Sequence, residues 1–290
     1  MGKLLFIMLA LVLIMPAKSS GNAPEIETLR TASFTMDYFR FGKGNRTLVI
    51  LPGISVKSVM NYAGAIEESY RLLAEDFTVC VMDRRKDIPA RYSVCDMAGD
   101  TAEALRALGL SRVCVFGASQ GGMMAMKLAA DNPGLVDCMI LGSTSAQVTP
   151  EQYSAVFGGF VRLAEEGNAE ALSLAFGEAV YPREVFAQSR ELLVESAKTV
   201  TPEDLSRFVI MTEGMRGFDV TDGLRKITCP VLVIGSYSDK VFGGDASVRI
   251  MELLGGRPGC ELFMYDGYGH AAYDTAPDYR ERMMNFLRKH

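Results

Sequence analysis

Short apolar runs, many of them rich in β-branched residues, alternate along the chain with segments of helical periodicity. The apolar runs predict buried strands at 47–53, 77–83, 112–119, 136–144, 229–236 and 260–267. The segments between and after them predict helices at 61–76, 96–110, 121–133, 244–254 and 276–288. Continuous apolar runs are typical of parallel strands that are covered on both faces. The pattern therefore predicts an α/β fold with a doubly wound, mostly parallel sheet.

Two segments depart from this alternation. Residues 25–42 show mixed alternation, which predicts an antiparallel pair of strands at the edge of the sheet. Residues 148–221 show helical periodicity, several aromatic residues and no convincing strand, which predicts a helical insertion. We therefore expect an α/β core made of 24–147 plus 222–290, with the insertion 148–221 as a helical cap over the sheet.

The first 23 residues differ in composition from the rest of the chain. Lys3 precedes an uncharged apolar run from Leu4 to Met15, a proline ends the run, and small residues follow. This is the order of a secretory signal, and the run is shorter than the roughly 20 residues of a membrane-spanning helix. We expect a signal peptide (residues 1–23) and a secreted or cell-envelope protein. The alternatives are an uncleaved anchor, or a start codon misassigned upstream of Met36 and a cytoplasmic protein.

Composition and charge limit the partners of the protein. The chain has 290 residues, of which 49% are hydrophobic, so it is able to bury a sizeable core. Its formal net charge is -5, and it lacks the basic stripe that nucleic-acid-binding proteins present. We expect a small-molecule ligand, no nucleic acid, and no membrane contact beyond the N-terminal segment. The sequence leaves the oligomeric state open.

The six cysteines are expected to be free thiols. Three of them lie inside predicted strands, where a thiol packs as a small hydrophobe: Cys80, Cys114 and Cys138. The other three stand singly, without Cys-x-x-Cys spacing and without a metal-type pairing with the two histidines. We therefore expect no metal site, although an even number of cysteines would permit disulfides in an oxidising compartment.

The residues that can carry chemistry stand at the ends of predicted strands. Ligands of an open parallel sheet bind beyond the carboxyl ends of its strands. Ser119 ends the third predicted strand within the sequence GASQG, Asp239 follows the fifth strand and His270 follows the sixth. A Gly-x-Ser-x-Gly sequence alone is a weak signal. Here a serine, an acid and a histidine fall at one edge of the sheet in the order Ser, Asp, His.

Ser119, His270 and Asp239 are candidates for the nucleophile, base and acid of a catalytic triad. A serine hydroxyl becomes a good nucleophile only when a base takes its proton. His270 is the candidate base, because the only other histidine is the C-terminal residue, His290. Asp239 would fix the imidazole tautomer and stabilise the imidazolium that forms during attack.

Two other aspartates near the histidine are alternatives for the acid. Asp266 and Asp274 lie close to His270 in the sequence and also suit a supporting or N-cap role. Asp239 is favoured because it follows a strand end, whereas the other two are not expected to reach the imidazole from the required side.

Two further groups have ordinary structural interpretations. The run Asp83-Arg84-Arg85-Lys86 is expected to be a solvated loop at a strand end, and the alternative is that it attracts an anionic substrate. Met123, Met124 and Met126, on the helix after the serine, are expected to fill the core.

In this order and context, the residues resemble the α/β-hydrolase superfamily. The resemblance extends from about Met36 to Leu287, and its strongest parts are GASQGG as nucleophile elbow, KITCPVLVIGSYSD around the acid and YDGYGH around the histidine. It implies an oxyanion hole made by the backbone amides of Ile54 and Gln120, to which the following helix adds the positive end of its dipole. Where many relatives have His-Gly before the first of these amides, this chain has Pro-Gly.

The resemblance implies a serine hydrolase that acts on a small carboxylic ester or a related acyl substrate through an acyl-enzyme intermediate. It implies no metal and no organic cofactor. The same triad also serves acyltransferases and hydrolases of carbon-carbon bonds, and a non-catalytic ligand-binding protein on the same scaffold is a further alternative.

Overall fold

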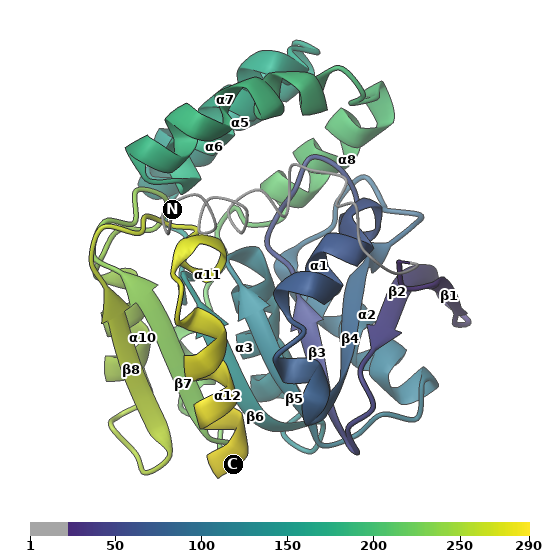
Figure 1. Ribbon diagram of the computed structural model, residues 1–290, viewed down its shortest axis with the longest axis vertical. Helices are drawn as coiled ribbons and strands as arrows, with labels where there is room; N and C mark the ends of the chain where they lie inside the picture. The colour runs from purple at the N-terminus through teal and green to yellow at the C-terminus, as the bar shows by residue number, and fades with distance from the viewer. Residues whose placement is uncertain (1–22) are drawn as a thin grey trace, which may run out of the picture.

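Residues 23–290, which the computed structural model describes, form one eight-stranded sheet with helices on both faces (Figure 1). The strands are β1 (Ile26–Arg30), β2 (Thr35–Phe41), β3 (Arg46–Leu51), β4 (Phe77–Arg85), β5 (Val113–Ala118), β6 (Val136–Gly142), β7 (Val231–Ser236) and β8 (Cys260–Tyr265). Their order across the sheet is β1-β2-β4-β3-β5-β6-β7-β8. β2 pairs antiparallel with β1 and β4, and the remaining pairings of these strands are parallel. The predicted fold class and the antiparallel edge are confirmed.

The helices of the core follow the predicted order, with one difference. They are η1 (Val59–Tyr62), α1 (Ala63–Ser69), η2 (Leu73–Glu75), α2 (Val94–Ala107), α3 (Gln120–Asp131), α10 (Ala246–Leu253), α11 (Ala272–Thr275) and α12 (Tyr279–Lys289). The prediction of one helix over 61–76 is wrong, because α1 lies between two 3₁₀ turns. The chain bends after α1, and this bend lets Tyr70 and Leu73 both enter the core.

The strands are apolar at successive positions because helices cover the sheet on both sides. All six residues of β5 are buried. Val113 and Val115 belong to one core cluster, which includes residues of α2 and α3, whereas Cys114 and Phe116 belong to a second cluster with α1 and α12. Side chains alternate between the two faces of a strand, so a strand covered on both faces needs an apolar residue at each position.

Helices fill the segment between β6 and β7. They are α4 (Pro150–Gln152), the π-helical turn η3 (Tyr153–Phe157), α5 (Gly158–Glu165), α6 (Ala169–Val180), α7 (Arg183–Ala197), α8 (Pro202–Glu213) and α9 (Thr221–Leu224). In Figure 1, α5, α6 and α7 form a separate layer above the sheet. The amide of Val148 donates to the carbonyl of Phe218 at 2.8 Å, and the amide of Val220 donates to that of Ala146 at 2.9 Å. These bonds join the two ends of the helical insertion, whose bounds at 148 and 221 stay a prediction.

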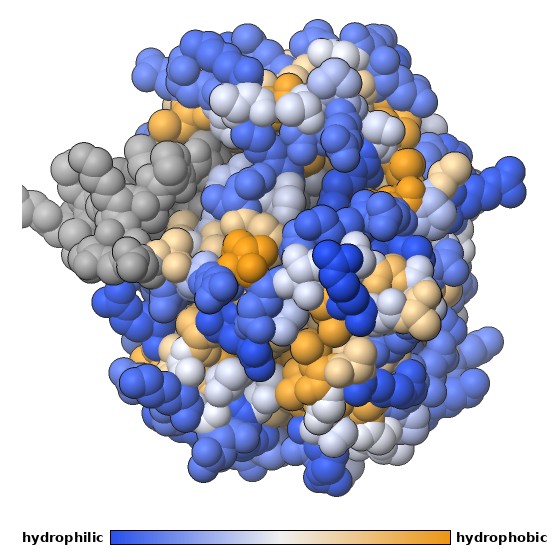
Figure 2. Space-filling view, turned by 90° about the vertical axis from the view of Figure 1, so that its right-hand side faces the viewer, coloured by the Kyte–Doolittle hydropathy of each residue, from blue (hydrophilic) through white to orange (hydrophobic). Residues whose placement is uncertain are grey.

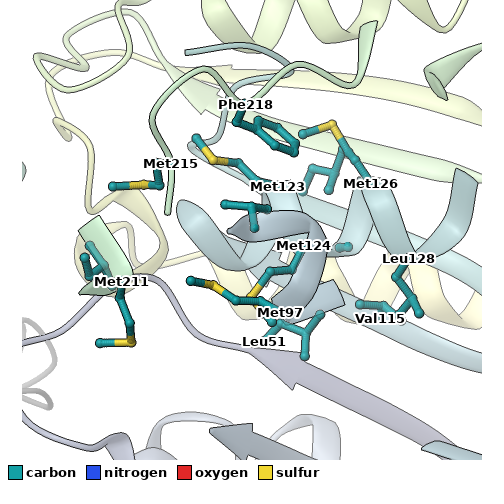
Figure 3. Packing of buried hydrophobic residues seen from close by; sticks show 14 of the residues in the cluster. Leu51, Met97, Val115, Met123, Met124, Met126, Leu128, Met211, Met215 and Phe218 are labelled. Atoms are coloured by element: carbon teal, nitrogen blue, oxygen red, sulfur yellow. The ribbon is translucent and has the colours of Figure 1, made fainter. Parts of the chain in front are cut away.

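Methionines pack α3 against the helical insertion. Met123, Met124 and Met126 of α3 are buried, as predicted, and share one cluster with Met211 of α8 and with Met215 (Figure 3). Flexible thioether side chains fill irregular gaps between elements that meet at different angles. The helix that follows Ser119 is therefore held from the side of the insertion as well as by the sheet.

One face of the molecule is mostly polar (Figure 2). Figure 2 shows the face on the side of β1 and β2, where hydrophilic residues predominate and apolar residues form small separate patches. Among the described residues, the large hydrophobic side chains that are exposed are those of Ile26, Leu72 and Tyr237. No described helix is long and apolar enough to cross a membrane. The predicted signal peptide falls almost wholly on residues 1–22, which lie outside the described part of the chain.

All six cysteines are free, and Cys80, Cys114 and Cys138 are buried in strands. Within residues 23–290 there is no group of three His, Cys, Asp or Glu side chains placed to hold a metal ion.

Candidate active site

Ser119 stands on a sharp turn between β5 and α3. Its φ of 53° and ψ of -122° lie in a region that residues other than glycine rarely adopt. The turn requires two glycines. A Cβ on Gly117 would lie 2.4 Å from the carbonyl oxygen of Gly121, and a Cβ on Gly121 would lie 1.9 Å from that of Leu51. The first turn of α3 therefore packs directly on the end of β3, with no room for side chains between them.

His270 and Asp239 are hydrogen-bonded to each other after β8 and β7. The His270 Nδ1 and Asp239 Oδ2 atoms are 2.9 Å apart, and both side chains are buried. The other carboxylate oxygen, Oδ1, accepts from the amides of Val241 at 2.7 Å and Phe242 at 3.2 Å. Burial acts to raise the pKa of Asp239, but His270 and the two amides outweigh it and hold this pKa below its ordinary value. The pair thus consists of an ionised carboxylate and an imidazole whose orientation the carboxylate fixes through Nδ1.

One cavity brings Ser119 and His270 together. Both line a hollow of about 820 Å³, which includes the space at its opening to solvent. Small-molecule sites are typically concave and mostly apolar. No hydrogen bond joins the Ser119 hydroxyl to His270 within residues 23–290, and such bonds are often long until substrate binds. Phe176 of α6 and Tyr181, which directly follows this helix, line the same cavity, so two of the aromatic residues of the insertion face the site.

The two predicted oxyanion residues border Ser119. Gly53 packs on the serine, because a Cβ on this glycine would lie 3.1 Å from the Ser119 Cβ and 3.7 Å from its Oγ. The next residue, Ile54, lines the cavity. Gln120 is the first residue of α3, and its side chain is completely buried. Ile54 thus directly follows a residue that packs on Ser119, and Gln120 directly follows Ser119 in the chain.

The two alternative acids lie in different surroundings. Asp266 is exposed. Asp274 is buried and lines the cavity, but its carboxylate makes no hydrogen bond to His270 among the described residues. Burial raises the pKa of Asp274 to about 6, against the opposing effects of Arg280 and His270. Asp239 is the carboxylate that contacts the imidazole.

Asp274→Asn should make stability less dependent on pH. The raised pKa means that folding favours the protonated acid, so its contribution to stability is complete below the unfolded pKa of about 3.9 and is lost as the pH rises through 6. Relative to wild type, the variant should gain roughly 2 kcal/mol in free energy of unfolding between pH 4.5 and pH 8. Urea unfolding at the two pH values measures this gain. An equal gain in Asp266→Asn, at an exposed position, would contradict the explanation.

The prediction of a solvated loop at 83–86 is wrong for 83–85, which lie in β4, whereas Lys86, just after the strand, is exposed. Asp83 and Arg84 lie inside β4 and are buried. Asp83 accepts from Arg207 of α8 at 2.7 Å and from Ser58 at 2.6 Å. Buried charges need such partners. One feature of the sequence indicates that the strand continues here: no glycine or proline separates these charged residues from the apolar run before them.

A nucleophile-elbow serine, a hydrogen-bonded His-Asp pair and a mostly parallel sheet define the α/β-hydrolase class of enzymes. The profile of the family described as alpha/beta hydrolase fold matches residues 46–277. The chain therefore belongs to the alpha/beta hydrolase fold family and is an enzyme of this class, as the resemblance in its sequence implies.

Similar proteins agree with this assignment. The chain is 26% identical over 224 residues to "Putative carbamate hydrolase RutD" of Agrobacterium fabrum, covering 74% of this chain and 84% of that relative. The crystal structure of MGS-M2, an alpha/beta hydrolase enzyme from a deep-sea metagenome library, superposes with a TM-score of 0.80 at 21% identity, over 90% of this chain and 97% of the other. The enol-lactonase of Burkholderia xenovorans LB400 gives a TM-score of 0.77 at 17% identity, over 90% and 100%. At these identities the two structures show a shared fold.

Proposed function

We propose that the protein is a serine hydrolase of a small carboxylic ester or a related acyl compound. Ser119 attacks the carbonyl carbon, and His270 takes the serine proton and returns it to the leaving group. Water then attacks the acyl-enzyme with the same histidine as base. Asp239 keeps the imidazole in the tautomer that presents Nε2 as the proton acceptor.

One observation carries this proposal: the Asp239-bound His270 shares a cavity with a serine held at positive φ. Strained backbone persists where the surrounding structure enforces it, and it is concentrated at functional sites. The His270 Nδ1 is occupied by Asp239 at 2.9 Å, which leaves Nε2 for the serine. A merely structural histidine would not need a serine on a strained turn beside it.

The oxyanion of the tetrahedral intermediate is proposed to bind the amides of Ile54 and Gln120. Gln120 begins α3, a helix of 12 residues, so its amide is at the positive end of the helix dipole. Loss of one such donor typically lowers kcat by about 10²- to 10³-fold. Both donors are backbone groups, so stabilisation of the oxyanion depends on the relative positions of the two chain segments that carry them.

The surroundings of Ser119 favour an apolar substrate of modest size. A second hollow, of about 660 Å³, adjoins the first and shares Ile54, Ser55, Phe176 and Tyr181 with it. We propose that one part of the substrate occupies the hollow that Ser119 lines, and that the other part extends into the adjoining hollow. The helical insertion acts as a cap that closes both hollows and excludes bulk water. Relatives named for carbamate and lactone hydrolysis act on the same kind of carbonyl centre.

A fluorophosphonate probe tests the proposal. The probe should modify the folded wild-type protein on the peptide that contains Ser119, as peptide mass spectrometry shows. The unlabelled enzyme should turn over short- to medium-chain nitrophenyl esters, lactones or carbamates, and labelling should abolish this activity. Added alcohol should not divert the acyl group from water if the enzyme is a hydrolase. Folded protein without a label would contradict the serine mechanism, and ester products made only with added alcohol would identify an acyltransferase.

A further inference from the structure

Arg84 is a buried cation at the carboxyl end of β4 that the proposed mechanism does not use. Its side chain is 3% exposed. One guanidinium nitrogen, Nη2, donates to the carbonyl oxygen of Pro52 at 2.8 Å and to the Oε1 of Gln120 at 2.8 Å. Burial lowers the pKa of Arg84 to about 10, so the group is still a cation at neutral pH. A buried cation is costly unless it is paired and hydrogen-bonded, which makes a simple space-filling role a poor explanation.

The two acceptors of Arg84 belong to the two segments that carry the proposed oxyanion amides. Pro52 precedes Gly53 and Ile54, and Gln120 supplies the other amide itself. Gly53 has no side chain to restrict its backbone. The hydrogen bond from Arg84 to the Pro52 carbonyl, just before this glycine, therefore restrains the loop directly. A single nitrogen atom of Arg84 thus connects the loop after β3 with the first turn of α3.

The same network continues into the helical insertion. The Gln120 Nε2 donates to the carbonyl oxygen of Met211 in α8 at 2.8 Å. The neighbouring Asp83 pairs with Arg207 of α8 at 2.7 Å, and the amide of Arg84 donates to the same carboxylate at 2.7 Å. Both polar groups of the Gln120 amide are therefore used, one toward Arg84 and one toward the insertion. The side chain of Gln120 has one orientation that satisfies both.

We infer that Arg84 is a positioning residue that fixes the two segments of the oxyanion hole relative to each other. The inference rests on the proposed function. Arg84 holds the Pro52 carbonyl and the Gln120 side chain at one point, while α8 holds Gln120 from the other side. The amides of Ile54 and Gln120 then keep a constant separation, which preorganised stabilisation of an oxyanion requires. In this arrangement, the packing of α8 against Gln120 and Asp83 helps to hold the two segments of the oxyanion hole in place.

Arg84→Met tests the inference through the transition state. The change removes both hydrogen bonds and replaces the arginine with an unbranched apolar side chain, so kcat should fall by about 10²-fold while KM changes by less than about threefold. The inhibition constant of a trifluoromethyl ketone, whose hemiketal oxygen occupies the oxyanion hole, should rise in proportion to the loss in kcat/KM. Arg84→Lys keeps the charge, but its ammonium stands one bond closer to the backbone than Nη2 does, so it should recover only part of kcat.

The matched control is Arg257→Met. Arg257 is a partly buried arginine that also donates to a backbone carbonyl, that of Cys229 at 2.8 Å, but it lies before β8, at the opposite edge of the sheet. This variant should keep kcat and the ketone inhibition constant within about twofold of wild type. A similar loss in both arginine variants would indicate general destabilisation and overturn the inference.

Gln120→Leu tests the same hydrogen-bond network at the partner of Arg84. It keeps the Gln120 backbone amide and removes the side-chain acceptor of Arg84, so it should also lower kcat and weaken the ketone, even where Arg84→Met fails to fold. The double variant with Arg84→Met should lose less kcat than the product of the two single losses, because both changes break the same contact.

A wild type that hydrolyses esters, with kcat unchanged in Arg84→Met or in Gln120→Leu, overturns the inference and leaves the proposed function standing. Full recovery of kcat in Arg84→Lys would assign the effect to charge rather than position. A wild type without hydrolytic activity overturns both proposals.

Discussion

Ser119→Ala should lower kcat for a nitrophenyl ester by a factor of about 10⁵ to 10⁶, because no acyl-enzyme forms without the hydroxyl. The residual rate should come from the oxyanion hole and substrate binding alone. Steady-state hydrolysis and labelling by fluorophosphonate measure the effect, and both should be lost together. The fold should be retained, since alanine removes one atom from a turn whose backbone is held by its neighbours.

Ser143→Ala is the matched control for this loss. Ser143 is a buried serine at the end of the adjacent strand β6, it also has a positive φ, of 43°, and its hydroxyl has no partner among the described residues. It shares the strained backbone of Ser119 but does not line the cavity. Its variant should keep kcat within a few-fold of wild type. Comparable losses at both positions would show that the backbone, rather than the nucleophile, is being perturbed.

Asp239→Asn should lower kcat by about 10⁴-fold, because the amide no longer holds the imidazole in the required tautomer. The variant also loses the negative charge that stabilises the imidazolium next to the tetrahedral intermediate. The effect should appear in kcat more than in KM, since Asp239 contacts His270 rather than the cavity. A pH profile of kcat/KM and circular dichroism of the variant separate lost catalysis from lost structure.

Asp266→Asn and Asp274→Asn decide between the possible acids. The exposed Asp266 should be replaced with little effect, and Asp274 should affect substrate preference and stability rather than the proton transfer. A larger loss of kcat at 266 or 274 than at 239 would reassign the acid. Equal losses at 239 and 274 would mean that the buried carboxylates act on His270 together.

The order of elements was predictable from the sequence because the central parallel strands of this sheet are buried on both faces. A residue such as Cys114 or Phe116 is apolar whichever face it lies on, so the strand reads as a continuous run without any knowledge of its neighbours. The positions of Ser119, Asp239 and His270 followed from the rule that carboxyl ends of parallel strands meet at one edge. These features were predictable because an apolar run and the end of a strand are both visible in a short stretch of sequence.

The helix at 61–76 was not predictable in the same way. Its helical periodicity is real, but Tyr70 and Leu73 enter the core on either side of a bend that depends on α12 and the sheet. Packing free energy outweighed helix propensity, which is a weak preference of a few tenths of a kcal/mol per residue. The boundaries of such a helix are decided by tertiary packing rather than by local sequence.

By itself, the sequence determined the fold class, the edge of the sheet at which the candidate catalytic residues lie, and the one internal histidine. Only the tertiary structure decided which carboxylate contacts that histidine: Asp239 at 2.9 Å, with Asp274 buried nearby. It also decided that Arg84 is a buried link between the loop after β3 and Gln120, instead of a solvated charge. The physical reason is that burial and hydrogen bonding of a charged side chain depend on partners more than 30 residues away, which no local pattern of polarity records.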